Sequence, residues 1–264
     1  MRIGIFDSGL GGLIIAKSVI KTLPKYSYTY LGDTKNIPYG KKSQAQIYNL
    51  TKKALVQLFK LDCKLVIIAC NTSSAKALRK IQREFLPKKY PDRKVLGVIV
   101  PTLEAIPKNA KKIGVLATTS TVKSHAYKKE LFKLNPELKV IEQSAPELAS
   151  LIEAGKLENA EKQLTKYLNN LLSKQVDTIV LGCTHYCYLK QIIQKSISSK
   201  IKLISQDNII PLKLKTYLLK HPEISNTIST NSNKDFYITK QNSNYPKIAE
   251  KLFGKKVNFK LIDI

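Results

Sequence analysis

Two cysteines stand at the ends of apolar runs, a position typical of chemically active side chains. Cys70 closes the run KLVIIAC and is followed by Asn-Thr-Ser-Ser, and Cys183 closes the run TIVLGC and is followed by Thr-His. Each cysteine leads from a strand-like run into polar residues that favour the start of a helix. Because a helix N-terminus stabilises an anion, we expect each thiol to be shifted toward its reactive thiolate form.

Two other interpretations of the cysteines stay open. A buried cysteine often serves only as a small apolar side chain, and this explains Cys63 well. Cys183, His185 and Cys187 alternate along the chain as metal ligands on one strand face do, and Cys70 would supply a fourth ligand. The sequence lacks the paired C-x-x-C knuckles that are usual in zinc sites, so we expect no metal here.

Motifs for hydrolysis and nucleotide binding are incomplete. Asp7, Ser8 and His185 supply the residue types of a catalytic triad, but Phe6 occupies the first place of the G-x-S-x-G nucleophile elbow. Ile14 occupies the last place of G-x-G-x-x-G, and no P-loop lysine follows. The glycines of the GLGG stretch are instead expected to allow a tight turn and close backbone approach to a small ligand.

Two thiols together fit a different reaction. Inversion of a carbon centre by proton transfer needs one group that removes a proton from one face and a second group that delivers a proton to the opposite face. Two thiols in one closed site repel each other as a double anion, which favours the state with one proton. Asp7 beside Cys70 and His185 beside Cys183 would tune the pKa values of the thiols. This interpretation accounts for the most residues at once.

Short β-branched runs alternate with amphipathic stretches along the chain. We expect strands at residues 2–6, 28–31, 64–69, 95–100, 112–117, 138–142, 178–182 and 202–205. Helices are expected between them, and residues 44–60 and 73–85 each place their apolar side chains on one face. This alternation is typical of βαβ units with mainly parallel sheets, in which ligands bind at the carboxyl ends of the strands.

A weak internal repeat indicates two similar α/β lobes. Ile3-Gly-Ile-Phe6 is echoed by Ile113-Gly-Val-Leu116, and Cys70-Asn-Thr72 is echoed by Cys183-Thr184. Each half therefore has an opening strand with a polar turn and a later strand that ends in cysteine. We expect the two lobes to face each other across a cleft, with one thiol on either side of a bound small molecule.

Composition limits the class of protein. The 264 residues carry 45 Lys and Arg against 19 Asp and Glu, a net charge of +26, and 43% are apolar. No run approaches the roughly 18 apolar residues that span a bilayer. The N-terminus does not read as a secretion signal, so we expect a cytoplasmic protein with no membrane contact and with reduced cysteines. Since few of the cations are arginine, a solvated lysine-rich surface is favoured over one that binds nucleic acid.

The sequence resembles the bacterial glutamate racemases, members of the cofactor-independent aspartate/glutamate racemase superfamily. The matching pieces run along nearly the whole chain: IFDSGLGG at 5–12, GDTKNIPYG at 32–40, ACNTSSA at 69–75, VIVPTLEAI at 98–106, GVLATTSTVKSHAY at 114–127, LIEAG at 151–155 and GCTHY at 182–186. The ACNT and GCTH motifs, in this order, are the most specific part of the resemblance.

The resemblance implies reversible interconversion of L- and D-glutamate without a cofactor, which supplies D-glutamate for peptidoglycan. It also implies a first lobe of residues 1–97 plus 207–264, which carries Asp7, and a second lobe of residues 98–206, which carries His185. Aspartate racemase is the closest rival activity. A module that binds an acidic amino acid without turnover, and a role on nucleic acid through the basic surface, are alternatives from other classes. Whether the protein forms a homodimer is left open.

The resemblance assigns roles to individual residues. Cys70 would act on D-glutamate and Cys183 on L-glutamate. Asp7 would assist near Cys70, whereas His185 and Glu153 would assist near Cys183. The residues that would bind or line the substrate are Asp7, Ser8, Pro38, Tyr39, Gly40, Asn71, Thr72, Thr118, Thr121, Thr184 and His185. The serine, asparagine and threonines are also preferred helix caps, and capping is compatible with carboxylate binding at a helix start.

Two positions depart from the family pattern. Cys187 stands where the family commonly has proline after GCTHY, so the following helix is expected to start differently. In LISQDNII at 203–210, Ser205 and Gln206 replace the usual Asp-Ser, which puts a supporting role at these positions in question.

Overall fold

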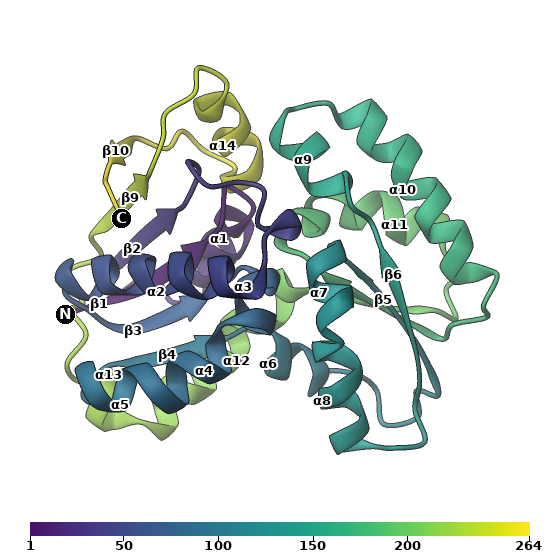
Figure 1. Cartoon of the computed structure of the whole chain (residues 1–264), viewed down its shortest axis with the longest axis horizontal. Helices are drawn as coiled ribbons and strands as arrows, with labels where there is room; N and C mark the ends of the chain where they lie inside the picture. The colour runs from purple at the N-terminus through teal and green to yellow at the C-terminus, as the bar shows by residue number, and fades with distance from the viewer.

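The structure, a computed structural model that describes residues 1–264, is an α/β fold with two separate sheets (Figure 1). The first sheet has the strand order β10-β9-β2-β1-β3-β4, and the second has the order β6-β5-β7-β8. The strands are β1 (Arg2–Asp7), β2 (Tyr28–Gly32), β3 (Cys63–Ile68), β4 (Lys94–Gly97), β5 (Lys112–Ala117), β6 (Lys139–Ser144), β7 (Thr178–Gly182), β8 (Lys202–Ile204), β9 (Lys234–Ile238) and β10 (Phe259–Leu261). All neighbouring strands run parallel, so the prediction of two α/β lobes with parallel sheets is confirmed.

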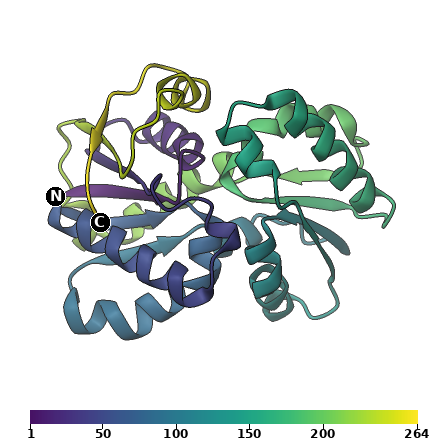
Figure 2. The ribbon, with the colours of Figure 1, turned by 45° about the horizontal axis from the view of Figure 1, so that its top comes forward.

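Helices fill the connections between the strands. They are α1 (Gly12–Thr22), α2 (Gln44–Lys60), α3 (Asn71–Lys76), α4 (Leu78–Lys80), α5 (Leu86–Lys89), α6 (Ile99–Leu103), α7 (Thr119–Ser124), α8 (Ala126–Leu134), α9 (Leu148–Glu153), α10 (Leu157–Leu172), α11 (Lys190–Ser196), α12 (Gln206–Lys220), α13 (Pro222–Ser225) and α14 (Tyr245–Phe253), with the 3₁₀ helices η1 (Tyr39–Lys41) and η3 (Thr184–Leu189) and the π-helix η2 (Ile81–Phe85). Both chain ends lie on the lobe of the six-stranded sheet (Figure 2).

In the first lobe, helices cover both faces of the sheet because its inner strands are apolar on both sides. Ile3 and Ile5 of β1 pack in the core shared with α1, α12 and α14, whereas Phe6 packs in the core shared with α2. α2 starts at a capping box formed by Ser43 and Gln46. β1 is an inner strand of this sheet. Its carboxyl end lies directly beside the carboxyl end of β3, which leads to Cys70.

The second lobe repeats this plan with fewer strands. Tyr127 and Leu131 of α8 pack against Val115 of β5 on one face, and Leu164 of α10 packs on the other face with Leu116. The core under α10 belongs to the same buried cluster as the core under α1. The two lobes are thus in apolar contact at the base of the cleft.

The chain crosses between the lobes twice. β4 pairs in the first sheet and β5 in the second, so the first crossing runs through α6. β8 pairs in the second sheet, whereas α12 packs on α1 of the first lobe, so the second crossing lies at the start of α12. The lobe boundaries proposed from the sequence, 1–97 plus 207–264 and 98–206, stay a prediction.

The sequence does not predict β9 and β10. β9 reads Lys-Asp-Phe-Tyr-Ile and β10 reads Phe-Lys-Leu, and most of their residues are only partly buried. Both strands lie at or next to the edge of the first sheet, where an apolar run is not required. β9 forms because it pairs with β2, and its local sequence pattern does not predict a strand.

Two predicted elements differ from the structure near the first crossing. The strand predicted at 95–100 ends at Gly97, because the backbone of Val98 is helical and α6 follows. The helix predicted at 73–85 begins earlier, at α3, and breaks at Ala77 before it widens into η2. A Cβ on Gly97 would lie 2.4 Å from Leu78 Cδ2, so the broken helix packs directly on the glycine backbone.

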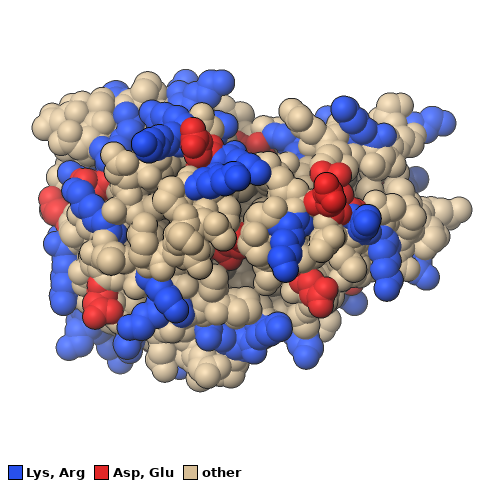
Figure 3. Space-filling model, turned by 90° about the horizontal axis from the view of Figure 1, so that it is seen from above, with Lys and Arg blue, Asp and Glu red and all other residues tan.

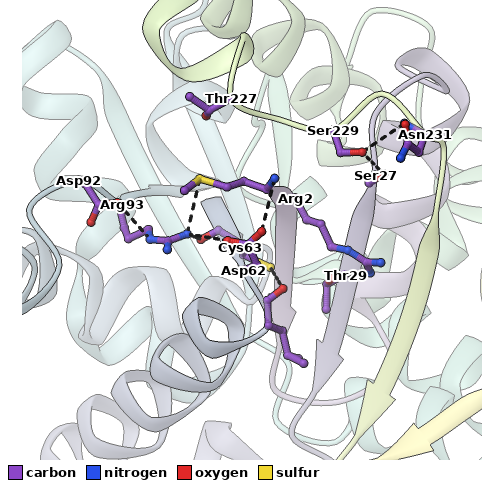
Figure 4. Close-up of polar contacts among 12 residues, drawn as sticks. Arg2, Ser27, Thr29, Asp62, Cys63, Asp92, Arg93, Thr227, Ser229 and Asn231 are labelled. Atoms are coloured by element: carbon purple, nitrogen blue, oxygen red, sulfur yellow. Dashed lines mark hydrogen bonds and ion pairs between the residues drawn. The ribbon is translucent and has the colours of Figure 1, made fainter.

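Ion pairs close the amino-terminal edge of the first sheet. Arg2 pairs with Asp235. Arg93 pairs with Asp92 at 3.3 Å and with Asp62 at 3.7 Å (Figure 4). These arginines are therefore engaged within the chain. None of the helices has the length and the apolar composition needed to cross a membrane.

Candidate active site

A cavity of about 500 Å³ opens where the carboxyl ends of β3 and β7 meet between the lobes. Both Cys70 and Cys183 line it, one from each lobe. The other sequence-predicted residues that line it are Ser8, Pro38, Tyr39, Gly40, Asn71, Thr72, Thr118, Glu153, Thr184 and His185. Of the predicted set, Asp7 and Thr121 do not line the cavity, and both are fully buried beside it.

Cys70 caps the N-terminus of α3. Its backbone is extended while the next residue is helical, so its sulfur accepts a hydrogen bond from the Ser73 N–H at 3.5 Å. Ser8 Oγ lies 3.2 Å from the same sulfur. The loop after β1 and the start of α3 thus hold the thiol in place at the floor of the cavity.

The expected shift of Cys70 toward thiolate is not what the structure produces. Burial raises the pKa of the Cys70 thiol to about 11, and the Asp7 carboxylate adds to this increase, while the hydrogen bonds from Ser8 and Ser73 oppose it. α3 is only six residues long, and its N-terminal partial charge does not offset the loss of water. With this raised pKa, Cys70 is a neutral thiol near pH 7.

Cys183 belongs to a chain of three ionisable groups in the second lobe. His185 Nδ1 lies 3.8 Å from the Cys183 sulfur, and His185 Nε2 lies 3.6 Å from Glu153 Oε1. The second distance exceeds that of a hydrogen bond, so Nε2 makes none, but it is within ion-pair range. Glu153 Oε1 also accepts a hydrogen bond of 2.6 Å from the Leu10 N–H of the first lobe.

His185 and Glu153 stabilise each other's charged form. Burial alone would lower the pKa of His185, but the Glu153 carboxylate and Cys183 raise it well above its usual value. Burial alone would raise the pKa of Glu153, but His185 and the Leu10 N–H lower it. Near neutral pH the pair is therefore an imidazolium and a carboxylate, and the imidazolium is the cation beside the Cys183 sulfur.

Asp7, the last residue of β1, is buried beside the cavity and does not line it. Its Oδ1 accepts from the Gly9 N–H at 3.0 Å, and its Oδ2 accepts from the Thr184 hydroxyl at 3.3 Å. Burial raises the pKa of Asp7, whereas the positive His185 lowers it. Because Asp7 is covered on all sides, it has no direct route to a ligand in this conformation.

The glycines of the GLGG stretch are expected from the sequence to allow close approach of a ligand, but Gly9 and Gly11 lie against side chains of the second lobe. A Cβ on Gly9 would lie 2.1 Å from Glu153 Oε1, and a Cβ on Gly11 would lie 2.5 Å from His185 Nδ1. The glycines therefore let the first lobe approach the carboxylate and imidazole of the second lobe, and their open side is not reserved for a ligand.

Three threonine hydroxyls bridge the cleft. Thr72 Oγ1 of the first lobe lies 3.0 Å from Thr118 Oγ1 and 3.3 Å from Thr121 Oγ1 of the second lobe, and the last two are 3.0 Å apart. Thr118 also caps α7. These hydroxyls therefore satisfy one another across the gap between the lobes.

The loop at Pro38–Gly40 forms another wall. Tyr39 is buried and its hydroxyl donates to Asp33 Oδ2 at 2.6 Å, so its polar end is turned to its own lobe. A Cβ on Gly40 would be in ordinary contact with Thr118, at 3.5 Å. The loop thus packs against the threonines of the facing lobe.

Sequence reasoning missed four lysines at the cavity: Lys41, Lys42, Lys76 and Lys123. Lys41 and Lys42 come from the loop around η1, Lys76 ends α3, and Lys123 lies on α7 of the other lobe. None takes part in an ion pair. Lysine and arginine side chains are spread over the face shown in Figure 3, so composition could not single out these four lysines.

The side chains considered as metal ligands, Cys70, Cys183, His185 and Cys187, are not grouped as a metal site requires. No three His, Cys, Asp or Glu side chains lie so that they could hold a metal ion together. Cys187 is buried below the cavity wall, where burial raises the pKa of its thiol to about 11.

Comparison with known proteins identifies the relatives of this chain. Residues 14–206 match the family model described as Asp/Glu/hydantoin racemase. A glutamate racemase from Fusobacterium nucleatum is 37% identical over 263 residues, which cover 97% of this chain and 95% of that protein.

Solved structures agree in fold. A glutamate racemase isoform from Bacillus anthracis superposes with a TM-score of 0.88 at 32% identity over 100% of this chain and 97% of that chain. A glutamate racemase from Francisella tularensis, solved in complex with D-glutamate, has a TM-score of 0.88 at 31% identity over 99% and 97% of the two chains.

We expect Glu153→Gln to lower the pKa of His185, because burial would then act on the imidazolium without a carboxylate to oppose it. The amide keeps the size of the side chain and an acceptor for the Leu10 N–H. An NMR titration of the imidazole resonances measures the shift. His125 and His221 serve as internal references in the same spectra, and an unchanged His185 pKa would show that Glu153 is not its charge partner.

Proposed function

The chain belongs to the glutamate racemases of the Asp/Glu/hydantoin racemase family, and we propose that it interconverts L- and D-glutamate by proton transfer between two thiols and the α-carbon. The observation that carries the mechanism is that Cys70 and Cys183, from different lobes, line one cavity. The product D-glutamate would serve peptidoglycan synthesis, as the family resemblance implies.

The proton balance follows from this placement. With one enantiomer, the thiolate on one side takes the α-proton and becomes a thiol, which leaves a carbanion at the α-carbon. The thiol on the other side then gives its proton to the opposite face and becomes a thiolate. The enzyme ends in the mirror protonation state, which is ready for the product enantiomer. By family resemblance, Cys70 takes the proton of D-glutamate and Cys183 that of L-glutamate.

Neighbouring groups would assist each thiol. His185, held as an imidazolium by Glu153, stabilises a thiolate at Cys183. Ser8 and the Ser73 N–H stabilise a thiolate at Cys70. Asp7, whose pKa burial raises, does not reach the cavity and would act through Thr184, whose hydroxyl donates to it at 3.3 Å.

Hydrogen-bond donors at the cavity would stabilise the charge that develops on the substrate carboxylate. Asn71 and the hydroxyls of Thr72 and Thr118 are the available side chains, whereas the Thr184 hydroxyl already donates to Asp7. A preorganised donor of this kind contributes about 3–4 kcal/mol, a factor of 10²–10³ in rate. The unpaired lysines favour a substrate with two carboxylates, and glutamate is proposed over aspartate on the strength of the relatives.

We expect Cys70→Ala and Cys183→Ala each to abolish racemisation, because each removes one of the two proton-transfer groups. Purified protein is incubated with L-glutamate and, separately, L-aspartate in deuterium oxide without added cofactor. Formation of the D-enantiomer and of deuterium at the α-carbon is measured. Cys63→Ala, a buried thiol far from the cavity, is the matched control and should retain activity.

Full activity in either cavity mutant would end the two-thiol mechanism. Inversion without solvent deuterium in the product would contradict proton exchange. Turnover of aspartate alone would replace the proposed substrate.

We expect kcat/KM to rise between pH 7 and 8.5, by up to about tenfold per pH unit, because the reactive Cys70 thiolate is scarce far below a pKa of about 11. Since the equilibrium constant of a racemase is unity, kcat/KM must rise equally in both directions. Initial rates for both enantiomers across this pH range measure it. A flat profile would contradict a raised Cys70 pKa in the free enzyme.

We expect the double variant Lys41→Gln/Lys123→Gln to lower kcat/KM for glutamate about three- to tenfold at low salt, because cations around a cavity raise the encounter rate with an anion. The loss should shrink at about 0.5 M salt, where the charges are screened. Lys162→Gln/Lys166→Gln, on the exposed face of α10, removes the same charge and should leave kcat/KM unchanged. Equal losses in both double variants would mean that only net charge matters.

A further inference from the structure

Three buried side chains form a closed set of hydrogen bonds behind the cavity. Asn71 Nδ2 donates to Gln206 Oε1 at 2.8 Å, and Gln206 Nε2 donates to Asn71 Oδ1 at 2.8 Å, so the two amides pair reciprocally. The Tyr127 hydroxyl donates to Asn71 Oδ1 at 2.6 Å and accepts from Gln206 Nε2 at 3.1 Å. Asn71 is 2% exposed, and Gln206 and Tyr127 are 0% exposed.

A count of donors and acceptors leaves one group free. Asn71 Oδ1 accepts two hydrogen bonds, and Gln206 uses its oxygen and both N–H groups. Of the two N–H groups on Asn71, one is given to Gln206 and the other has no partner in the chain. Asn71 is also the only member of the set that lines the cavity. The free N–H is therefore the single polar group that this set can offer to a ligand.

The set spans the junction of the lobes. Asn71 follows Cys70 at the start of α3, and Tyr127 lies on α8 of the second lobe. Gln206 is the first residue of α12, where the chain crosses back to the first lobe. The Asn71 amide is thus hydrogen-bonded by Tyr127 of the second lobe and by Gln206 at the crossing. Its orientation is therefore maintained only while the two lobes are in contact.

Gln206 is one of the positions at which this chain departs from the pattern of the family it resembles. Its side-chain amide pairs with both Oδ1 and Nδ2 of Asn71, which a serine hydroxyl could not do. The serine at position 205 is turned elsewhere, since its hydroxyl pairs with Asp207.

We propose that Gln206 and Tyr127 are positioning residues, which orient the Asn71 amide so that its free N–H donates to the substrate carboxylate as charge develops there. This inference rests on the proposed racemase function. Because a fixed donor matters more as negative charge grows, the two residues act on kcat more than on KM.

The test is a double-mutant cycle in the full-length enzyme. Asn71→Ala should lower kcat about 10²-fold, and Gln206→Met, which keeps the length of the side chain, should lower it about 10-fold with less than a threefold change in KM. The variant with both substitutions should be no slower than Asn71→Ala alone, because Gln206 acts only through Asn71. Losses that multiply in the double variant would overturn the proposal.

Tyr127→Phe provides a second arm in case Gln206→Met fails to fold. It removes the hydroxyl that donates to Asn71 and should lower kcat about three- to tenfold, without further loss in the Asn71→Ala background. Tyr28→Phe is the matched control, because the buried Tyr28 hydroxyl donates to the Leu23 carbonyl at 2.7 Å at the amino end of β2, and Tyr28 does not line the cavity. Thermal melts of both variants show whether the two hydroxyls contribute similarly to stability.

A fall in kcat for Tyr127→Phe that Tyr28→Phe does not share supports the positioning role. Equal effects of the two substitutions would mean a purely structural contribution and would overturn the inference. If the wild-type enzyme failed to racemise glutamate, the proposed function itself would be contradicted, and that outcome is separate from either result of the cycle.

Discussion

A buried thiol can act as a base only if its surroundings offset the loss of water around its charge. Around Cys70 the protein supplies only two hydrogen-bond donors, Ser8 and the Ser73 N–H, and it places the Asp7 carboxylate nearby, so the pKa stays at about 11. The missing positive charge is one that an amino-acid substrate carries in its ammonium group. Under the proposed mechanism, the reactive thiolate at Cys70 would form when the substrate ammonium group lies beside it.

Cys183 differs from Cys70 in having a cationic side chain of the protein beside its sulfur. The imidazolium of His185 is the lasting cation beside Cys183, and it is held by Glu153. Glu153 is in turn bound by the Leu10 N–H of the other lobe, and the bare backbone at Gly9 makes this approach possible. The charge state of the His185–Glu153 pair therefore depends on contact with the first lobe. Under the proposed mechanism one site would obtain its cation from the ligand and the other from the protein, which is a physical reason for the different neighbours of the two thiols.

The sequence predicted those parts of the site that local pattern determines. The apolar runs that end at Cys70 and Cys183 specify parallel strands, and the carboxyl edges of such strands meet at one cavity. Motif resemblance placed Glu153 there, although its position at the end of α9 gives no local signal. The lysines at the cavity were missed because many others look the same in sequence. β9, the buried position of Asp7 and the contact between Gly9 and Glu153 depend on tertiary packing between segments far apart in the chain, which no periodicity encodes.

The polar lining also bears on how tightly a substrate can bind. Thr72, Thr118 and Thr121 are already hydrogen-bonded to one another across the lobes. A carboxylate that enters must replace these neutral contacts, so the gain is only the difference between charge-assisted and neutral hydrogen bonds, the former about twice as strong. Affinity for the ground state is thereby moderated. A donor such as the free N–H of Asn71, which has no partner to give up, keeps its full effect for the charge that develops during proton transfer, and this favours rate over tight binding.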